Sequence, residues 1–202
     1  MIVIVDYGIS NIGAVKNALE FLKIKSIISS SKDEIKGAKK IIIPGNGNFG
    51  EGVRLLKATG IYNVLNDLVL NKKVPILGIC LGYQLMFKES EEDNNFRGFG
   101  WIEGKVKKFK EKKKFPVPHV GWNSISFKDI SVMKDIPSNS RFYFDHSYYP
   151  MVSDFEYLSG STKYSTKFPS IFQKDNIIGC QPHLEKSQKY GLVMLKNFCE
   201  TC

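Results

Sequence analysis

The stretch from Val74 to Phe87 constrains the fold most, because its pattern predicts a buried strand that turns sharply into a helix. Val74 to Ile79 is apolar apart from one glycine, as is typical of a parallel strand covered on both faces. Leu81 to Phe87 carries little polar surface and predicts a helix that follows at once. We therefore expect a sheet covered by helices, with Cys80 at a corner between strand and helix.

Cys80 is flanked by Gly78 and Gly82, each two residues away. Missing side chains allow the strand and the helix to pack closely around a strained residue, which is the nucleophile-elbow pattern with cysteine in place of serine. Free N–H groups and the positive dipole end at a helix start favour a thiolate and suit a developing oxyanion. From this stretch alone, a buried cysteine that only packs in the core is the alternative.

The part of the chain before residue 89 alternates between strand and helix patterns, which predicts an open, mostly parallel twisted sheet flanked by helices. A glycine-rich loop, Pro44 to Gly50, follows one of these strands; it lacks the Lys-Ser/Thr of a P-loop, so it indicates either amides turned inward toward an anion or a tight connection. The expected strands are 2–5, 26–29, 40–43 and 74–79, and the expected helical stretches are 12–23, 33–36, 51–70 (interrupted near Gly60) and 81–87.

After an acidic loop at 89–95, short strand patterns separated by Gly, Pro, Asn and Ser turns predict additional antiparallel strands in the C-terminal half. No linker or internal repeat divides the chain, so residues 1–202 are expected to form a single domain. The expected strands are 99–102, 104–109, 122–127, 141–149, 156–158, 170–172 and 177–180, and a helix from 186 to 198 closes the chain.

The formal net charge of +9 arises largely from one lysine-rich run between Lys105 and Lys114. Lysine without arginine, and without a helix-turn-helix or finger pattern, predicts a solvated hairpin; an electropositive face for a protein partner or anionic ligand is the alternative, and nucleic acid is not expected. The four cysteines are too sparse for a disulfide scaffold, and the C-terminal C-x-x-C lacks the further ligands of a metal site. With no signal-peptide pattern and no membrane-length apolar stretch, we expect a cytoplasmic protein without membrane partners, metal or cofactor.

A cysteine nucleophile needs a base and a group that orients the base. Among the three histidines, His183 follows the last predicted strand, with Glu185 two residues beyond it. On an extended segment these two side chains point the same way, so Glu185 would hold one imidazole nitrogen while the other faces a thiol. A lone His-x-Glu is a weak signal and is more often a surface or structural pair.

Together these motifs resemble the class I (triad) glutamine amidotransferases and, within that class, the glutaminase subunits of imidazole glycerol phosphate synthases. Segments carrying the resemblance span nearly the whole chain in order. They are Val5-Asp6-Tyr7-Gly8 with Asn11, Pro44 to Gly52, Gly78 to Phe87 with Ser90-Glu91-Glu92, Gly121-Trp122-Asn123, Phe142 to Tyr148 and His183 to Ser187.

The resemblance implies hydrolysis of L-glutamine to glutamate and ammonia by a catalytic triad of Cys80, His183 and Glu185. It implies an oxyanion hole from backbone amides of the loop Gly45, Asn46 and Gly47 and of Leu81. It also implies a heterodimer with a (β/α)8 synthase subunit that receives the ammonia to make imidazole glycerol phosphate and the carboxamide nucleotide AICAR in histidine biosynthesis. Matching positions around glutamine are Gln84, His146, Ser147 and Tyr148, and matching positions on the partner-facing rim are Asn11, Trp122, Tyr143 and Lys186.

Two departures from the family pattern leave other hypotheses open. Pro182 and Leu184 flank the histidine where the family usually has Gln-Phe-His-Pro-Glu, so the approach of His183 to Cys80 is expected to differ slightly. Asn46 occupies a position that is commonly apolar, and its amide would compete for backbone hydrogen bonds of the loop. These departures favour, as alternatives, a paralogue that supplies ammonia to a surface-sugar amidating enzyme, or a non-catalytic regulatory module with a vestigial triad.

Overall fold

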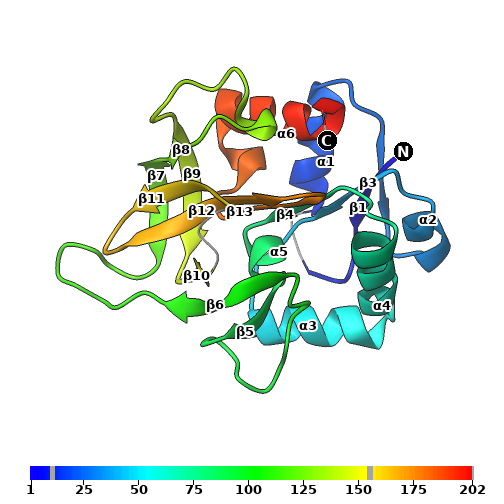
Figure 1. Cartoon of the computed structure of the whole chain (residues 1–202), viewed down its shortest axis with the longest axis horizontal. Helices are drawn as coiled ribbons and strands as arrows, with labels where there is room; N and C mark the ends of the chain where they lie inside the picture. The colour runs from blue at the N-terminus through cyan, green and yellow to red at the C-terminus, as the bar shows by residue number, and fades with distance from the viewer. Residues whose placement is uncertain (10–11, 154–156, 202) are drawn as a thin grey trace.

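The computed structural model describes residues 1–9, 12–153 and 157–201, and its centre is an eight-stranded sheet (Figure 1). The first five strands in sheet order are mutually parallel and the last three run antiparallel. The predicted parallel strands and some of the predicted antiparallel strands therefore belong to one sheet. In sheet order the strands are β2 (Ser26–Ser29), β1 (Ile2–Val5), β3 (Lys40–Ile43), β4 (Ile76–Ile79), β13 (Ile177–Cys180), β12 (Lys167–Lys174), β11 (Leu158–Lys163) and β8 (Ser126–Phe127).

Both faces of β1, β3, β4 and β13 are buried, because alternate residues of each strand pack into different hydrophobic clusters, whereas Ile28 on the edge strand β2 is 40% exposed. In β1, Val3 and Val5 pack with helices α3 (Phe49–Ala58) and α4 (Ile61–Asn66), whereas Ile2 and Ile4 pack with α1 (Ile12–Phe21) and α6 (Gln188–Thr201) on the opposite face (Figure 1). The helices are α1 (Ile12–Phe21), α2 (Lys32–Lys36), α3 (Phe49–Ala58), α4 (Ile61–Asn66), α5 (Leu81–Gln84) and α6 (Gln188–Thr201), with a π turn at Asp67–Asn71 and 3-10 turns at Ser131–Met133 and Leu184–Lys186.

Two smaller sheets cover one end of the central sheet. One has the order β10 (Tyr148–Val152), β6 (Ile102–Lys108), β5 (Phe87–Ser90), and the other pairs β7 (His119–Ser124) with β9 (Arg141–His146). The sequence pattern predicted a hairpin for the lysine-rich run. That prediction was wrong, because β6 pairs with β10 and β5 rather than with the strand that follows it. Its lysines at 110 and 112–114 are exposed on the connection between β6 and β7.

Two further local predictions were wrong. The helix after Cys80 ends at Gln84, and Phe87 begins strand β5, because the apolar residues of this segment are shared between the central core and the β5–β6 pair. Glu185 does not lie on an extended segment: His183 is the N-cap of the 3-10 turn Leu184–Lys186, and this turn brings the carboxylate back to the imidazole.

Candidate active site

The carboxyl ends of β3, β4 and β13, three neighbouring parallel strands, meet at one edge of the sheet. The loop beginning at Pro44 follows β3, Cys80 follows β4, and the segment Gln181 to His183 follows β13. Segments far apart in the sequence are therefore brought together by parallel pairing alone, as is usual for ligand sites in open α/β sheets.

Cys80 has φ 52° and ψ −105°, a conformation that costs a non-glycine residue free energy and is common at functional corners. Its amide N–H donates to the Cys180 carbonyl at 2.8 Å, so the corner is anchored on β13. A Cβ on Gly82 would lie 2.0 Å from the Ile43 carbonyl oxygen, and a Cβ on Gly45 would lie 2.7 Å from the Gly82 nitrogen. Only glycines allow α5 to approach β3 and the loop after it this closely; the elbow pattern predicted close packing at Gly82 but not at Gly45.

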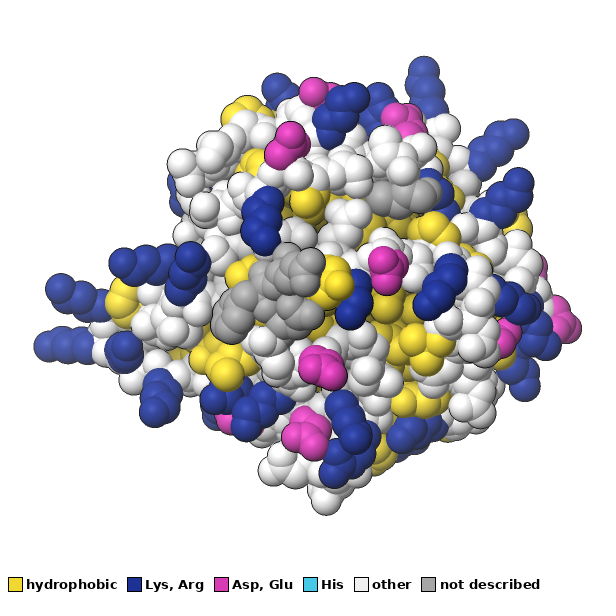
Figure 2. Space-filling view, viewed as in Figure 1, with side chains coloured by type: hydrophobic (Ala, Val, Ile, Leu, Met, Phe, Trp, Pro, Cys, Tyr) yellow, Lys and Arg dark blue, Asp and Glu magenta, His cyan; other side chains and the backbone are white. Residues whose placement is uncertain are grey.

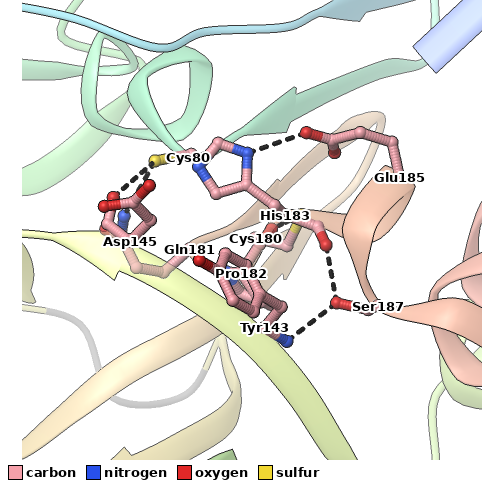
Figure 3. A network of polar contacts seen from close by, with 9 residues as sticks. All are labelled: Cys80, Tyr143, Asp145, Cys180, Gln181, Pro182, His183, Glu185 and Ser187. Atoms are coloured by element: carbon pink, nitrogen blue, oxygen red, sulfur yellow. Dashed lines mark hydrogen bonds and ion pairs between the residues drawn. The ribbon is translucent and has the colours of Figure 1, made fainter. Parts of the chain in front are cut away.

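His183 and Glu185 form a buried pair beside Cys80. Nδ1 of His183 lies 2.8 Å from Oε1 of Glu185, and each side chain is 3% exposed. The backbone N–H of His183 donates to the Tyr143 carbonyl at 2.9 Å, and the Ser187 hydroxyl donates to the His183 carbonyl at 2.6 Å. Figure 3 shows the imidazole between the sulfur of Cys80 and the carboxylate of Glu185. The imidazole is therefore fixed by hydrogen bonds to the His183 backbone and by the contact of Nδ1 with Glu185. Nε2 remains available for proton transfer.

Electrostatics around His183 favour its charged form. Burial alone lowers the pKa of the imidazole, but the neighbouring Cys80 and Glu185 outweigh it and raise this pKa to about 10. Nε2 of His183 is buried and makes no hydrogen bond within the described residues. The arrangement suits a thiolate and imidazolium pair, the activated form of a cysteine nucleophile.

A cavity of about 250 Å³ opens in front of Cys80. Its volume is smaller than the roughly 300 Å³ or more typical of drug-sized ligands and suits a small polar metabolite. Gly45 is not in the lining but packs against Leu81, and Figure 3 shows His183 next to the sulfur of Cys80 with Glu185 on the other side of the imidazole. The lining residues are Asn46, Gly47, Cys80, Leu81, Gln84, Glu92, Pro118, Asp145, His146, Ser147 and Tyr148, so the structure brings together the predicted substrate-binding positions apart from Gly45.

The model of the family described as glutamine amidotransferase class-I matches residues 3–202. A Methanococcus maripaludis protein named imidazole glycerol phosphate synthase subunit HisH 2 is 42% identical over 98% of each chain, and the subunit HisH of Methanocaldococcus jannaschii is 44% identical over 99% of each chain. The chain is a class-I glutamine amidotransferase of the HisH family. This confirms the family predicted from the motifs.

Solved structures support the same fold for this amidotransferase. The glutaminase domain of Trypanosoma brucei CTPS with bound acivicin superposes with a TM-score of 0.69 at 17% identity, covering 97% of this chain and 91% of that one. PurLQS from Thermotoga maritima gives a TM-score of 0.72 at 16% identity, covering 98% and 96%. At such low identity these likenesses show the fold alone, and they confirm the predicted fold class.

Sequence reasoning did not single out Glu92, Asp145 and Pro118 as cavity residues of this amidotransferase. Glu92 accepts a hydrogen bond from the Phe49 amide at 2.8 Å, and burial raises the pKa of its carboxyl group. The signal was present, because Ser90-Glu91-Glu92 is part of the family resemblance. Whether Glu91 or Glu92 faces the cavity depends on the path of strand β5. The sequence analysis predicted a helix over 81–87 and did not predict this strand.

Gln181 is the other site residue of the amidotransferase that the sequence analysis left unassigned. It is fully buried, its amide nitrogen lies 3.5 Å from the sulfur of Cys80, and its amide oxygen accepts from Gln84 at 3.1 Å. The Cys80 thiol itself lies 4.0 Å from the Asp145 carbonyl (Figure 3). Gln84 thus contacts Gln181 as well as the cavity, which its sequence position did not reveal.

Three of the predicted partner-facing residues lie together next to the site. Trp122 meets Tyr143 edge to face, with ring centroids 6.1 Å apart, and Nζ of Lys186 lies 5.6 Å from the centre of the Tyr143 ring. Tyr143 in turn bridges to His183. Asn11, the fourth predicted rim residue, falls outside the described residues.

Among the residues at 1–9, 12–153 and 157–201, no group of three or more His, Cys, Asp or Glu side chains could hold a metal ion. No helix in that part of the chain is long and apolar enough to span a bilayer.

Proposed function

We propose that this amidotransferase is the glutaminase subunit of an imidazole glycerol phosphate synthase, hydrolysing glutamine to glutamate and ammonia for histidine biosynthesis. The observation that carries the proposal is the strained Cys80 beside a buried His183 and Glu185 pair, in the lining of a cavity sized for a small polar metabolite.

In the proposed reaction the thiolate of Cys80 attacks the side-chain amide carbon of glutamine, and the carbonyl π electrons move onto oxygen. Backbone N–H groups of Leu81 and of the loop from Gly45 to Gly47 stabilise that oxyanion. His183 then donates its proton to the leaving nitrogen, the C–N bond breaks, and ammonia departs from a γ-glutamyl thioester. Water, deprotonated by the now neutral His183, attacks the thioester carbon and releases glutamate and the thiolate.

Substrate recognition is proposed to use the polar residues of the cavity wall. The carboxylate of Glu92 provides the negative charge that a free α-ammonium group requires, with Gln84, Ser147 and Tyr148 arranged around the same space. A chain-internal glutamine lacks that ammonium group, so this wall favours the free amino acid.

Relatives named as synthase subunits support a partner subunit, and the partner is proposed to be a (β/α)8 barrel that consumes the ammonia. The face carrying Trp122, Tyr143 and Lys186 is its proposed docking area, since Tyr143 connects that face to the backbone of His183.

A paralogous ammonia-supplying role is the second candidate. Methanococcus maripaludis has relatives numbered HisH 1 and HisH 2, which are 40% and 42% identical to this chain, so members of the family occur as two copies in one organism. A second copy is free to serve another acceptor, such as a surface-sugar precursor.

The decisive experiment measures glutamate release from glutamine by the purified chain, alone and with the barrel subunit from the same source, with and without the barrel's nucleotide substrate. Strong stimulation by barrel and nucleotide together supports the histidine-pathway assignment. If this barrel does not stimulate glutamate release while a glutamine-mimicking electrophile still labels Cys80, the result supports the paralogue. If Cys80 is not labelled even with the partner present, the triad is vestigial and the glutaminase proposal is wrong.

A further inference from the structure

Beyond the triad, the sulfur of Cys80 is contacted by the side-chain amide of Gln181. The Gln181 nitrogen lies 3.5 Å from the sulfur, a normal length for an N–H donor to sulfur. The amide cannot turn over freely, because its oxygen already accepts from the Gln84 nitrogen at 3.1 Å. In this orientation Gln181 presents an N–H to the atom that carries the negative charge of the thiolate.

Gln84 has its own orientation determined in the same way. Its amide nitrogen carries two hydrogens, and both are used: one is donated to Gln181 and the other to the Tyr148 carbonyl at 2.9 Å. The same carbonyl accepts a second hydrogen bond from Nδ1 of His146 at 2.7 Å. A carbonyl oxygen only accepts, so Nδ1 of His146 must carry the ring proton.

That tautomer determines the rest of the chain of hydrogen bonds. Nε2 of neutral His146 is bare and accepts from Nδ1 of His119 at 3.0 Å, which leaves Nε2 of His119 to accept from the Asn123 amide at 3.2 Å. The other hydrogen of that amide goes to the Lys163 carbonyl at 3.0 Å. Burial lowers the pKa of His119 to about 4 and that of His146 to about 3, so both rings are neutral near pH 7.

Each N–H hydrogen named in this series therefore has one acceptor, from Asn123 to the sulfur of Cys80. His119 and His146 are directly opposite each other in the β7–β9 register, so the pairing of these two strands holds the imidazoles in contact. Alternate residues of β7 face outward: Val120 is 54% exposed and Trp122 is 37% exposed. One short strand thus presents an apolar outer face and, on its inner face, the far end of a hydrogen-bonded chain that reaches the nucleophile.

We propose that Gln181 is a further catalytic residue, whose N–H stabilises the Cys80 thiolate, and that His119 is a positioning residue that keeps Gln181 oriented through His146, the Tyr148 carbonyl and Gln84. The inference deepens the proposed glutaminase reaction and rests on it for its meaning. Cys80 reactivity and histidine tautomers are measured independently of glutamine hydrolysis, so an absence of hydrolysis would overturn the proposed function without deciding the roles of Gln181 and His119.

The test of Gln181 is the pH dependence of Cys80 alkylation by iodoacetamide, followed by mass spectrometry of the peptide that contains Cys80. Gln181→Met keeps the length of the side chain and removes the donor, and Gln181→Glu keeps the shape and replaces the donor by a carboxylate. Loss of a hydrogen bond to a charged group is expected to move the alkylation midpoint upward by about one pH unit, giving about tenfold slower labelling below it. A midpoint within 0.2 of a unit of wild type in both variants overturns the role of Gln181.

The test of His119 is the tautomer of His146 seen by 15N NMR, which is tractable because the chain has three histidines. Wild-type His146 is expected to carry its proton on Nδ1, and a proton on Nε2 overturns the proposal before any variant is made. His119→Leu removes the donor to His146, whereas His119→Asn places an amide nitrogen near the position of Nδ1. In His119→Leu we expect His146 to lose its fixed tautomer and the pH midpoint of Cys80 alkylation to rise. In His119→Asn we expect the wild-type tautomer and the wild-type midpoint. An unchanged tautomer and midpoint in His119→Leu would overturn the positioning role.

Discussion

At Cys80 the backbone is strained and the side chain is almost enclosed, with 5% of the residue exposed. Strain of this kind persists only where the surroundings determine the conformation, and here an anchoring bond to β13 and two close-packed glycines do so. We expect Cys80→Ser to lower glutamine-dependent glutamate release by about 10³-fold or more, because a serine hydroxyl is not ionised beside His183. Synthesis by the complex from added ammonium salt is the control and should be spared; its loss would contradict ammonia transfer between subunits.

Glu185 raises the pKa of His183 by its charge and by its hydrogen bond. Glu185→Gln removes the charge while an amide keeps the size, so the imidazolium loses stabilisation and the ring can adopt the wrong tautomer. By analogy with other triads, turnover is expected to fall by about 10²-fold to 10⁴-fold. The His183 pKa, followed by NMR titration, should fall below that of wild type; an unchanged value would mean that Cys80 alone sustains the charged ring.

His119 and His146 give the folded protein an acid-sensitive component. Both have a pKa below the usual 6.5 of histidine, so the unfolded chain binds more protons than the folded chain between about pH 6.5 and pH 4. Stability from these rings is therefore complete above about pH 6.5 and is lost as the pH falls. Urea unfolding at pH 7, 6 and 5 should show a weaker pH dependence in His119→Asn than in wild type; parallel curves would show that the ring protonates freely in the folded state.

At the scale of elements, the parallel strands were predictable because each is a short apolar run bounded by turn residues. Strands β2, β3 and β13 begin and end at the residues the pattern indicated. The segment after Gln84 was not predictable from periodicity, since Leu85, Met86 and Phe87 are apolar whichever structure they adopt. Pairing in the C-terminal half was hidden for a different reason: β6 pairs in parallel with the preceding strand β5 and antiparallel with the distant strand β10, and local turn signals reveal neither pairing.

The candidate site divides in the same way. Cys80, His183 and Glu185 were identified because their residue types and motifs are distinctive, whereas Gln181 and His119 were not assigned roles because glutamine and histidine gain them only from what lies opposite. His119 depends on the β7–β9 register, and Gln181 on the adjacency of β4 and β13.

Close packing of α5 on β3 gives a test at this scale. In Gly82→Ala the new Cβ would lie 2.0 Å from the Ile43 carbonyl, so α5 must move away from the sheet. We expect a loss of about 2–4 kcal/mol in the free energy of unfolding and a fall in Cys80 alkylation, measured by urea titration and mass spectrometry. Gly13→Ala in α1 is the matched control, since no atom lies within 4 Å of its Cβ; it should leave stability unchanged or raise it by up to about 1 kcal/mol. Equal effects of the two changes would contradict the packing argument.

At the scale of the whole molecule, charge is spread unevenly. Lysine side chains project from the connection between β6 and β7 on the left of Figure 2, away from the helices that cover the parallel strands. The proposed docking area is instead aromatic, centred on Trp122 and Tyr143. Recognition of the partner is thus expected to depend more on buried aromatic area than on lysine charge.

Trp122→Ala tests that expectation. Removing a half-exposed indole from the centre of an interface is expected to weaken binding of the barrel subunit by about tenfold or more, measured by isothermal titration calorimetry. Phe21→Ala is the control, because Phe21 is also an exposed aromatic residue but lies on α1. A similar loss of affinity in both variants would place the interface elsewhere.

The adjacency of β4 and β13 has a consequence during synthesis. Gln181 lies 101 residues after Cys80, and His183 follows two positions later, so a chain emerging from the ribosome carries its thiol long before it carries the groups that activate it. The elbow at Cys80 is anchored on Cys180, and therefore it also cannot form until the last strand has been made and inserted between β4 and β12. The order of translation therefore delays activity: a nascent fragment that lacks β13 cannot form the site and cannot hydrolyse glutamine.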